Sequence, residues 1–451
     1  MTTISPTTGT AVDSNVGGHF GPLLKFSGWD CLEIQGIASE EIIIFIDGDK
    51  GLVTIQKACD IPIDTYDIVK VLTEQISETE KDRRSLSVIS TGSGSENTLI
   101  GCLNFSWYDP KRKTIRLKQA GRGGIGTVFR KKKIKAVIVR YSGARANMNP
   151  PADRNRVSRW GAKVSKEIKD YDDVQYRMRR TGTPYIVELA NGLDVLPVHN
   201  YRFGSHPDSE KVFNTVFEKR FTQGLFDGCW LGCTMSCCKA VDNYLVKTGR
   251  YQGKVVAVDG PEYETIASIG SNCGIFDPDH IIEANFYCDN YGIDTISFGT
   301  VTSFLMECYE MGLINREITE GLELSFGNEN AAMTLLHQMG SGKGFGAIAG
   351  MGIRRLKRYL ADNHGANREL LNDIGMESKG MEFSEYVTKE CLPQQAGYGL
   401  ANKGPHHDET CFLFNPFNTM EEVTEALFWF PMFRTWFSLN GLCKIVYNDI
   451  V

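Results

Sequence analysis

Short apolar runs separated by polar turns dominate the first third of the chain and predict β-strands. Residues 41–55 carry two such runs, EIIIFI and LVTIQ, on either side of the polar segment DGDKG. An Asp-Gly pair between two apolar runs is typical of a hairpin turn, so we predict a β-hairpin here. The run IKAVIVRY at 134–141 is almost continuously apolar and predicts a buried strand. SLSVIS at 85–90 and residues 115–118 are also predicted to be extended.

Polar and helical patterns separate these strands from the rest of the chain. We predict a helix over residues 64–81 and a loop for TGSGSEN at 91–97. The segment GARANMNPPADRNRVSRWG at 143–161 is polar and contains two prolines, which predicts a linker or domain boundary. The first 145 residues are therefore expected to be strand-rich, and helical periodicity dominates after them.

Three later segments have the spacing of helices. Residues 278–290 follow Asp277, a good capping residue, and begin with a proline at the first helical position. Residues 301–313 predict a second helix that ends near Gly312. The segment EEVTEALFWFPMFRTWFSL at 421–439 is strongly apolar, which predicts a core helix that Pro431 ends or kinks.

Composition excludes several classes of protein. The chain has 451 residues and a formal charge of −6, whereas a nucleic-acid binder needs a concentrated basic face. The sequence has neither an apolar run long enough to span a membrane nor the basic start and apolar core of a signal peptide, so we expect a cytoplasmic protein. Thirteen cysteines, an odd number, do not predict a disulfide framework.

One group of cysteines is clustered in the segment GCWLGCTMSCC. Cys229, Cys233 and Cys237 are spaced four apart, and Cys238 follows directly. Three thiolates from one segment with a distant fourth are a common ligand set for an iron–sulfur cluster. The same spacing also fits one apolar helix face, but Gly228 and the glycine at 232 oppose a regular helix. The spacing favours a cluster and leaves the identity of the metal open.

Other metal and nucleotide sites fit less well. A structural zinc site usually has paired C-x2-C halves, which this segment lacks. The element GRGGIG at 121–126 invites a dinucleotide-binding interpretation, but the acidic residue expected about 20 residues later is absent and Arg140 lies there instead. The basic run at 130–133 is most simply a solvated face.

Four further segments establish a family resemblance. They are, in order along the chain, NVGGHFG at 15–21, GRGGIG at 121–126, GPEYE at 260–264 followed by IIEANFYCDNYGIDTIS, and LPQQAGYGLANKGPHHDE at 392–409 followed by SLNGLC. In this order and spacing, the chain resembles the aldehyde:ferredoxin oxidoreductase family along nearly its whole length. The family consists of tungsten or molybdenum bis-pterin enzymes that also carry one [4Fe–4S] cluster.

The resemblance implies ligands for both cofactors. Cys229, Cys233, Cys237 and Cys443 match the cluster ligands, although the family spaces the first pair as C-x2-C, so Cys238 is an alternative to Cys229. DNYGID matches the family's first pterin motif, and Ser438 replaces the aspartate that begins the second. Lys118 lies where the family has an arginine. The positions implied to contact the pterin are Asn15, Gly17, Lys118, Gly121, Arg122, Asp289, Gly292, Ile293, Asp294, Ser438 and Leu442.

The resemblance also implies two catalytic residues. Glu264 and His407 match the family's active-site glutamate and histidine. The carboxylate of Glu264 is expected to orient or deprotonate a nucleophilic water, and His407 to hydrogen-bond the carbonyl oxygen. Glu262 is a rival to Glu264. Glu283 matches a residue that ligates a metal at a dimer interface in some relatives, but we expect it here to be an ordinary surface residue of a helix.

The fold implied by the resemblance is α+β. We expect a strand-rich pterin-binding domain at 1–145, a helical domain with the cysteine cluster at 146–375 and a truncated helical domain at 376–451. Family members are longer at both ends, so this chain is expected to be a fragment, a subunit completed by a partner, or a degraded paralogue.

The implied function is oxidation of a small aldehyde to a carboxylate, with electrons leaving through the cluster to ferredoxin or an iron–sulfur subunit. A homodimer, or a partner that supplies the missing segments, is also expected. The alternatives are a benzoyl-CoA reductase-type subunit, a non-catalytic electron-transfer or structural subunit that keeps the cluster without a pterin, and a zinc-stabilised scaffold.

Overall fold

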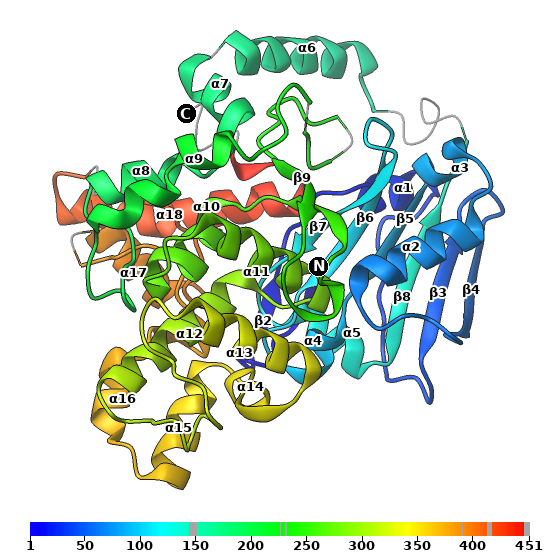
Figure 1. Cartoon of the computed structure of the whole chain (residues 1–451). Coiled ribbons are helices and arrows are strands. Elements are labelled where there is room, and N and C mark those ends of the chain that lie inside the picture. Colours follow the sequence, from blue (N-terminus) through cyan, green and yellow to red (C-terminus); the bar gives the residue numbers. More distant parts are fainter. Residues whose placement is uncertain are drawn as a thin grey trace.

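The N-terminal part of the protein is built on one mixed β-sheet. The computed structural model describes residues 1–143, 151–170, 172–225, 227–230, 232–389, 391–412 and 417–445. Its largest sheet has six strands in the order β4-β3-β8-β5-β6-β7 (Figure 1). These strands are β3 (Ile42–Asp47), β4 (Leu52–Lys57), β5 (Leu86–Ser90), β6 (Leu103–Asp109), β7 (Thr114–Ala120) and β8 (Ile134–Arg140). Only the β3–β8 pair is parallel.

Helices cover both faces of this sheet. α2 (Thr65–Ile76) packs Ile68, Val69 and Leu72 on one face. α1 (Phe20–Phe26) and α5 (Ile125–Lys131) pack on the other face, where Phe20 meets Phe105 edge to face. The central strand β8 is buried along nearly its whole length, because successive side chains of a strand point to opposite faces and both faces are covered here.

The predicted hairpin and strands are confirmed, and two details are wrong. β3 and β4 pair antiparallel around the DGDKG turn. The helix predicted over 64–81 ends at Ile76 as α2, and a second helix, α3 (Glu80–Arg84), begins after Thr79. Thr79 and Asp82 form a capping box, which nucleates a separate helix. The predicted loop at 91–97 contains a short helix, α4 (Ser93–Asn97).

The rest of the described chain is mainly helical, with two short hairpins. The helices are α6 (Arg154–Asp170), α7 (Asp172–Thr181), α8 (Tyr185–Gly192), α9 (Asn214–Glu218), α10 (Tyr263–Thr265), α11 (Pro278–Tyr291), α12 (Thr295–Glu310), α13 (Glu329–Ser341), α14 (Gly344–Ala349), α15 (Ile353–His364), α16 (Arg368–Ile374), α17 (Leu392–Leu400) and α18 (Met420–Leu439). The hairpins are β9 (Ala240–Leu245) with β10 (Val255–Asp259), and β11 (Glu377–Ser378) with β12 (Met381–Glu382). β1 (Thr2–Ile4) pairs with β2 (Ala11–Asp13) at the start of the chain. The predicted α+β class is confirmed.

Two buried helices form the centre of the helical part. α11 begins at Pro278 as predicted, and Asp277 accepts the N–H of Asp279 as its cap. α12 begins at Thr295, six residues earlier than predicted, because the side chain of Asp294 accepts the N–H of Ile296 and caps it there. Both helices are buried along most of their length within the largest core cluster.

The predicted linker at 143–161 is partly wrong. α6 begins at Arg154, so the second half of that segment is helical. Residues 144–150 lie outside the described part of the chain.

α18 departs from its predicted role as a core helix. It continues through Pro431, and its start is fixed by a capping box between Thr419 and Glu422. Only Val423 and Arg434 are buried, whereas Phe428 is 63% exposed and Leu439 is 81% exposed. The apolar side chains of α18 are therefore largely exposed, although their sequence predicted a core helix. None of the described helices combines the length and apolarity needed to cross a bilayer.

Candidate active site

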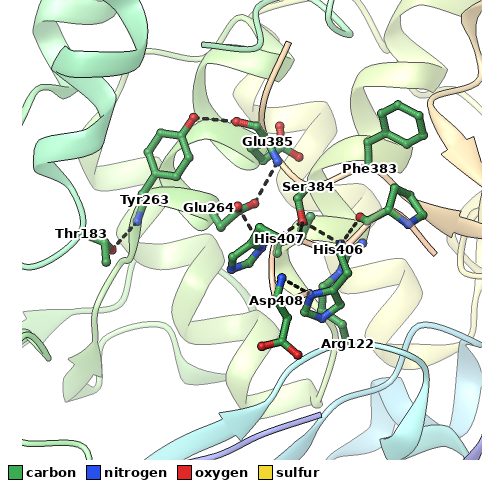
Figure 2. Close-up of polar contacts among 12 residues, drawn as sticks. Arg122, Thr183, Tyr263, Glu264, Phe383, Ser384, Glu385, His406, His407 and Asp408 are labelled. Atoms are coloured by element: carbon green, nitrogen blue, oxygen red, sulfur yellow. Dashed lines mark hydrogen bonds and ion pairs between the residues drawn. The ribbon is translucent and has the colours of Figure 1, made fainter. Parts of the chain in front are cut away.

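Glu264 lies on α10, where the backbone is irregular. One turn of π-helix, Ile266–Gly270, follows α10 directly. Such turns occur frequently at functional sites. The backbone N–H of Tyr263 donates to Thr183 Oγ1 at 2.9 Å, and the Tyr263 hydroxyl donates to the carbonyl of Glu385 at 2.6 Å. α10 is thus held at two points, which places Glu264 beside His407 (Figure 2).

The two oxygens of the Glu264 carboxylate have different surroundings. Oε2 accepts the backbone N–H of Glu385 at 2.9 Å. Oε1 lies 3.1 Å from Nδ1 of His407, but the two atoms are not aligned as a hydrogen bond, and Oε1 is buried without a hydrogen-bond partner among the described residues. A buried carboxylate oxygen without a donor can accept a hydrogen bond from a bound molecule.

Ser384 orients the imidazole of His407. Its hydroxyl lies 3.0 Å from Nδ1 of His407. The same oxygen accepts the backbone N–H of His407 and an Nη1–H of Arg122, each at 3.2 Å. A hydroxyl has two lone pairs and one proton, so these two donors leave the proton for Nδ1. The Ser384 hydroxyl favours the Nε2–H tautomer of neutral His407, whereas Oε1 of Glu264 at 3.1 Å favours a proton on Nδ1.

Burial keeps both histidines of the loop neutral near pH 7. Removal from water lowers the pKa of His407 from its usual 6.5, although the Glu264 carboxylate acts in the opposite direction. Removal from water lowers the pKa of the neighbouring His406 much further. Nδ1 of His406 accepts the N–H of Asp408 at 2.9 Å, so its tautomer is also fixed.

Arg122 connects the segments that form this site. Its Nε donates to Asp294 at 3.1 Å and its Nη2 donates to the carbonyl of Glu382 at 2.6 Å. Nη1 donates to Ser384 and to the carbonyl of Pro405, each at 3.2 Å. The guanidinium is only 4% exposed. Arg122 lies in the loop after β7. It therefore connects this loop to the start of α12, to the segment after β12 that contains Ser384, and to the loop before His407.

A second carboxyl group lies next to Glu264. Glu385 is fully buried, and burial raises its pKa well above the usual value, with the Glu264 charge adding to the effect. Thr300 Oγ1 donates to Oε1 at 2.8 Å, whereas Oε2 has no hydrogen-bond partner among the described residues. Burial thus favours the protonated, neutral form of the Glu385 carboxyl.

The structure brings the predicted cluster cysteines together. The thiols of Cys233 and Cys238 lie within hydrogen-bonding reach of Cys229, and Cys443 is close enough to Cys237 to affect its pKa. The hydrogen bond from Cys229 lowers the pKa of Cys233 to about 6 and raises that of Cys229. No three His, Cys, Asp or Glu side chains of the described chain are grouped tightly enough for a single ion. A cluster of four irons spreads its ligands more widely.

Buried ion pairs hold the cysteine loop against β7. Asp227 accepts from Arg112 and from Arg116, each at 2.7 Å. Arg116 also donates to Asp259 at 2.6 Å, and Lys118 pairs with the same carboxylate. All five side chains are less than 10% exposed. Arg116 and Lys118 of β7, with Arg112 in the turn just before it, thus form one group of cations that pairs with Asp227 and Asp259.

Comparison with known proteins decides the family. The N-terminal domain of aldehyde ferredoxin oxidoreductase matches residues 1–141, and domains 2 and 3 match residues 159–450. This chain belongs to the aldehyde ferredoxin oxidoreductase family. The predicted resemblance is confirmed.

Individual relatives match this chain over most of its length, and each of them is longer than this chain. A tungsten-containing aldehyde ferredoxin oxidoreductase of Pyrococcus abyssi is 28% identical over 416 residues, which are 90% of this chain and 61% of that protein. An "aliphatic sulfonate oxidoreductase, WOR-like subunit" of Pyrococcus furiosus is 27% identical over 419 residues, which are 91% of this chain and 63% of that protein.

Among solved structures, the active-site complex BamBC of benzoyl-coenzyme A reductase has a TM-score of 0.68 at 19% identity, which shows a shared fold. The match covers 95% of this chain and 61% of that chain. The chain spans about three-fifths of the length of these relatives.

Several positions suit the pterin cofactor of the aldehyde ferredoxin oxidoreductase family. Asp289 is 4% exposed, and its carboxyl has no hydrogen-bond or ion-pair partner among the described residues. Burial raises its pKa well above the usual value. Gly121 has open space where a Cβ would stand, so a bound group can approach its backbone. Asn15 Nδ2 donates to Ser438 Oγ at 2.7 Å, which joins the first and last implied segments. These residues fit a polar ligand.

Other implied pterin positions are used within the protein. Gly17 packs against the cysteine loop, since a Cβ there would lie 2.5 Å from the carbonyl oxygen of Cys229. Gly292 has a φ of +71° as the C-cap of α11, and Ile293 is buried. Leu442 is 46% exposed, and the donors of Arg122 described above reach protein acceptors. Pterin contact at these positions, and at Lys118 and Asp294, stays a prediction.

The prediction for Glu283 is wrong, because this family member buries it. Glu283 is 2% exposed and its carboxylate accepts from the hydroxyl of Tyr244, the backbone of Lys247, and both the backbone and hydroxyl of Thr248. Every contact is between 2.6 and 3.0 Å. The carboxylate is therefore held structurally by the β9–β10 connection.

Sequence reasoning missed Ser384 and Glu385. Both lie in the sequence FSEY after β12, which contains no motif. A useful signal was the acidic and polar pair inside an otherwise apolar segment, since buried polar residues in such a context usually have a specific partner.

Proposed function

We propose that this chain carries the active site of an oxidoreductase that oxidises an aldehyde to a carboxylate at a tungsten- or molybdenum-pterin centre. The observation that carries the proposal is the Glu264 carboxylate beside His407, whose Oε1 lies 3.1 Å from Nδ1 of His407 and has no hydrogen-bond partner among the described residues. A carboxylate next to an imidazole can supply the proton acceptor and the hydrogen-bond donor that an addition of water to a carbonyl requires.

The residues divide the work of the reaction. Glu264 accepts a proton from the water that adds to the aldehyde carbon, or from the hydrate already formed. His407 Nε2–H donates to the carbonyl oxygen and stabilises the negative charge that develops there. The Ser384 hydroxyl, which Arg122 holds in place, favours that tautomer of the imidazole.

The cofactors complete the balance of the reaction. One aldehyde and one water give one carboxylate, three protons and two electrons. When bound, the metal–pterin group supplies two-electron acceptance and the [4Fe–4S] cluster supplies transfer of single electrons. Asp289, Gly121, Asn15 and Ser438 would hold the pterin, and Cys229 or Cys238, with Cys233, Cys237 and Cys443, would hold the cluster.

A first experiment tests the cofactors. The protein is purified without oxygen from cells supplied with tungstate and molybdate, and W, Mo, Fe and Zn are measured per chain. We expect about one W or Mo and about four Fe. Iron without W or Mo contradicts the catalytic proposal and supports a non-catalytic subunit, and zinc alone supports a scaffold.

A second experiment tests the substrate class. Benzyl viologen reduction is followed with a panel of short aldehydes and, separately, with the 1,5-dienoyl-CoA product of benzoyl-CoA reduction. We expect reduction with at least one aldehyde. Reduction with the dienoyl-CoA alone contradicts aldehyde oxidation and favours the ring-reducing chemistry named for the BamBC complex.

A further inference from the structure

α6 is an amphipathic helix whose apolar stripe is not covered by the described chain. Val157, Trp160 and Val164 follow the three- and four-residue spacing of one helix face and are 56%, 54% and 42% exposed. The stripe continues to Ile168, which is buried at 6% exposure. Only the C-terminal end of α6 is therefore packed, and Figure 1 shows the helix along the top of the molecule.

Basic side chains flank this stripe. α6 contains six Lys or Arg residues and only two acidic residues in its seventeen positions, although the whole chain has a net charge of −6. Arg156, Arg159 and Lys163 are exposed, and Lys163 Nζ lies 4.8 Å above the ring of Trp160. An apolar centre with a charged rim is the usual composition of a protein interface.

The exposed helix is also in direct contact with the cysteine loop. Ser165 Oγ of α6 lies 3.4 Å from Oγ1 of Thr234, which stands between Cys233 and Cys237. Next along the chain, α7 packs Met178 against Met235 and Cys237, and Arg179 donates to the carbonyl of Thr234 at 3.4 Å. A molecule bound on α6 is thereby placed beside the proposed cluster.

We propose that α6 is the docking surface for an acidic electron-carrier protein that receives electrons from the cysteine-bound cluster. The proposal rests on the proposed function, because it needs a cluster that releases electrons. Opposite charges on the two proteins accelerate their encounter, and the apolar stripe supplies the contact that fixes orientation. The carrier takes up one electron at a time, so each aldehyde requires two docking events or two carriers.

The other basic run of the sequence provides a matched comparison. Lys131 and Lys133 are exposed at or just after the end of α5, but Lys133 donates to the carbonyl of Ser39. The neighbouring Ile37 is 71% exposed, but it lies in a loop rather than in a helical stripe such as that of α6. Figure 1 shows α5 below the sheet in the view, whereas α6 lies at the top with α7. The basic run of α6 and the run at 130–133 are similar in charge. They differ in that α6 contacts the cysteine loop.

The kinetic test reverses the charge of each run. Arg159→Glu with Lys163→Glu changes α6, and Lys131→Glu with Lys133→Glu is the control with the same change in charge. A bacterial-type ferredoxin of net negative charge is the acceptor in one assay and benzyl viologen in the other. For the α6 variant we expect a roughly tenfold higher KM for ferredoxin at low salt and an unchanged rate with the dye. An equal effect of both variants, or none at α6, overturns the proposal.

A binding test separates this proposal from the catalytic one. Zero-length carbodiimide cross-linking joins lysine amines to carboxylates in contact and needs no turnover. We expect mass spectrometry to find ferredoxin joined to Lys163 or Lys166, both exposed, even if no aldehyde is oxidised. Cross-links at Lys131 or Lys133 instead overturn it. Flotation of the protein with vesicles of 70% phosphatidylcholine and 30% phosphatidylserine, lost in the α6 variant, also overturns it, because a basic amphipathic helix then serves a membrane surface.

Discussion

The Glu264–His407 pair and the cysteine loop are held in place by different forces. Glu264, His407 and Ser384 are fixed by hydrogen bonds from backbone groups and from Arg122, and Oε1 of Glu264 has no hydrogen-bond partner among the described residues. The cysteine loop is held by buried ion pairs of Asp227 with Arg116 of β7 and with Arg112 in the turn before β7. The first arrangement positions a few atoms for chemistry, and the second holds a whole segment in place so that a large group can bind.

This difference predicts that a substitution in the cysteine loop prevents cofactor binding, whereas a substitution of Glu264 lowers turnover and leaves the cofactor content unchanged. The largest effect is expected for Cys237→Ser, because a serine oxygen is a poor iron ligand at neutral pH. Iron should fall from about four atoms per chain to near zero, with loss of the visible absorbance of the cluster. The exposed Cys59 provides a control, and Cys59→Ser should keep its iron. Full iron content in Cys237→Ser contradicts this ligand assignment.

Glu264→Gln should show the opposite pattern. Removing the proton acceptor should lower aldehyde turnover by about 10²–10⁴-fold while the metal content stays unchanged. The neighbouring Glu262 is the matched control, because it is bonded to Thr183 rather than directed at His407. Glu262→Gln should keep its turnover. If the two variants lose equal activity, the carboxylate at 264 has no special role.

Arg116→Met tests the ion pairs behind the cysteine loop. Arg116 pairs with Asp227 and Asp259 at 3% exposure, so its loss leaves buried carboxylates with fewer partners. The free energy of unfolding should fall by on the order of 3 kcal/mol, measured by denaturant titration of the metal-loaded protein. Lys57→Met removes an exposed ion pair with Glu40 and should leave the free energy of unfolding nearly unchanged. Equal effects contradict the importance of the buried pairs.

Ser384→Ala should lower turnover by about tenfold, because Nδ1 of His407 loses the donor that favours its Nε2–H tautomer. The effect should appear in kcat more than in KM, and Ser384→Thr should restore it. Histidine labelled with ¹⁵N reports the tautomer directly. A His407 signal that keeps the Nε2–H form in Ser384→Ala shows that another group sets the tautomer.

The smallest effect concerns pH. The mechanism requires neutral His407, whose pKa is lowered by burial. The rate should therefore stay level as the pH falls through 6.5 and decline only below it, when the folded protein begins to bind the proton. This is measured as kcat/KM between pH 5 and 8. A decline that is already half complete at pH 6.5 or above means that His407 is more accessible to water than its contacts indicate.

Local patterns predicted the elements, and long-range contacts determined the site. The strands around 41–56 and 134–141 and the cap at Asp277 depend on neighbouring residues, so the sequence reveals them. Ser384 and Arg122 are 262 residues apart, and no periodicity links them. Burial of Glu283 and exposure of α18 also depend on which distant segments pack there. The family motifs named Glu264 and His407, but the groups that orient them became visible only in the fold.

Arg122 has a consequence for the order in which the protein is made. Its acceptors at Asp294, Glu382, Ser384 and Pro405 follow it by 172 to 283 residues. At a synthesis rate of about 5–20 residues per second, roughly 15–60 s pass between the ribosome adding Arg122 and adding Pro405. The sheet can form early in this interval, while the loop that carries His407 arrives last. Until then Arg122 lacks the Pro405 acceptor, so the contacts around His407 are completed well after the sheet can form.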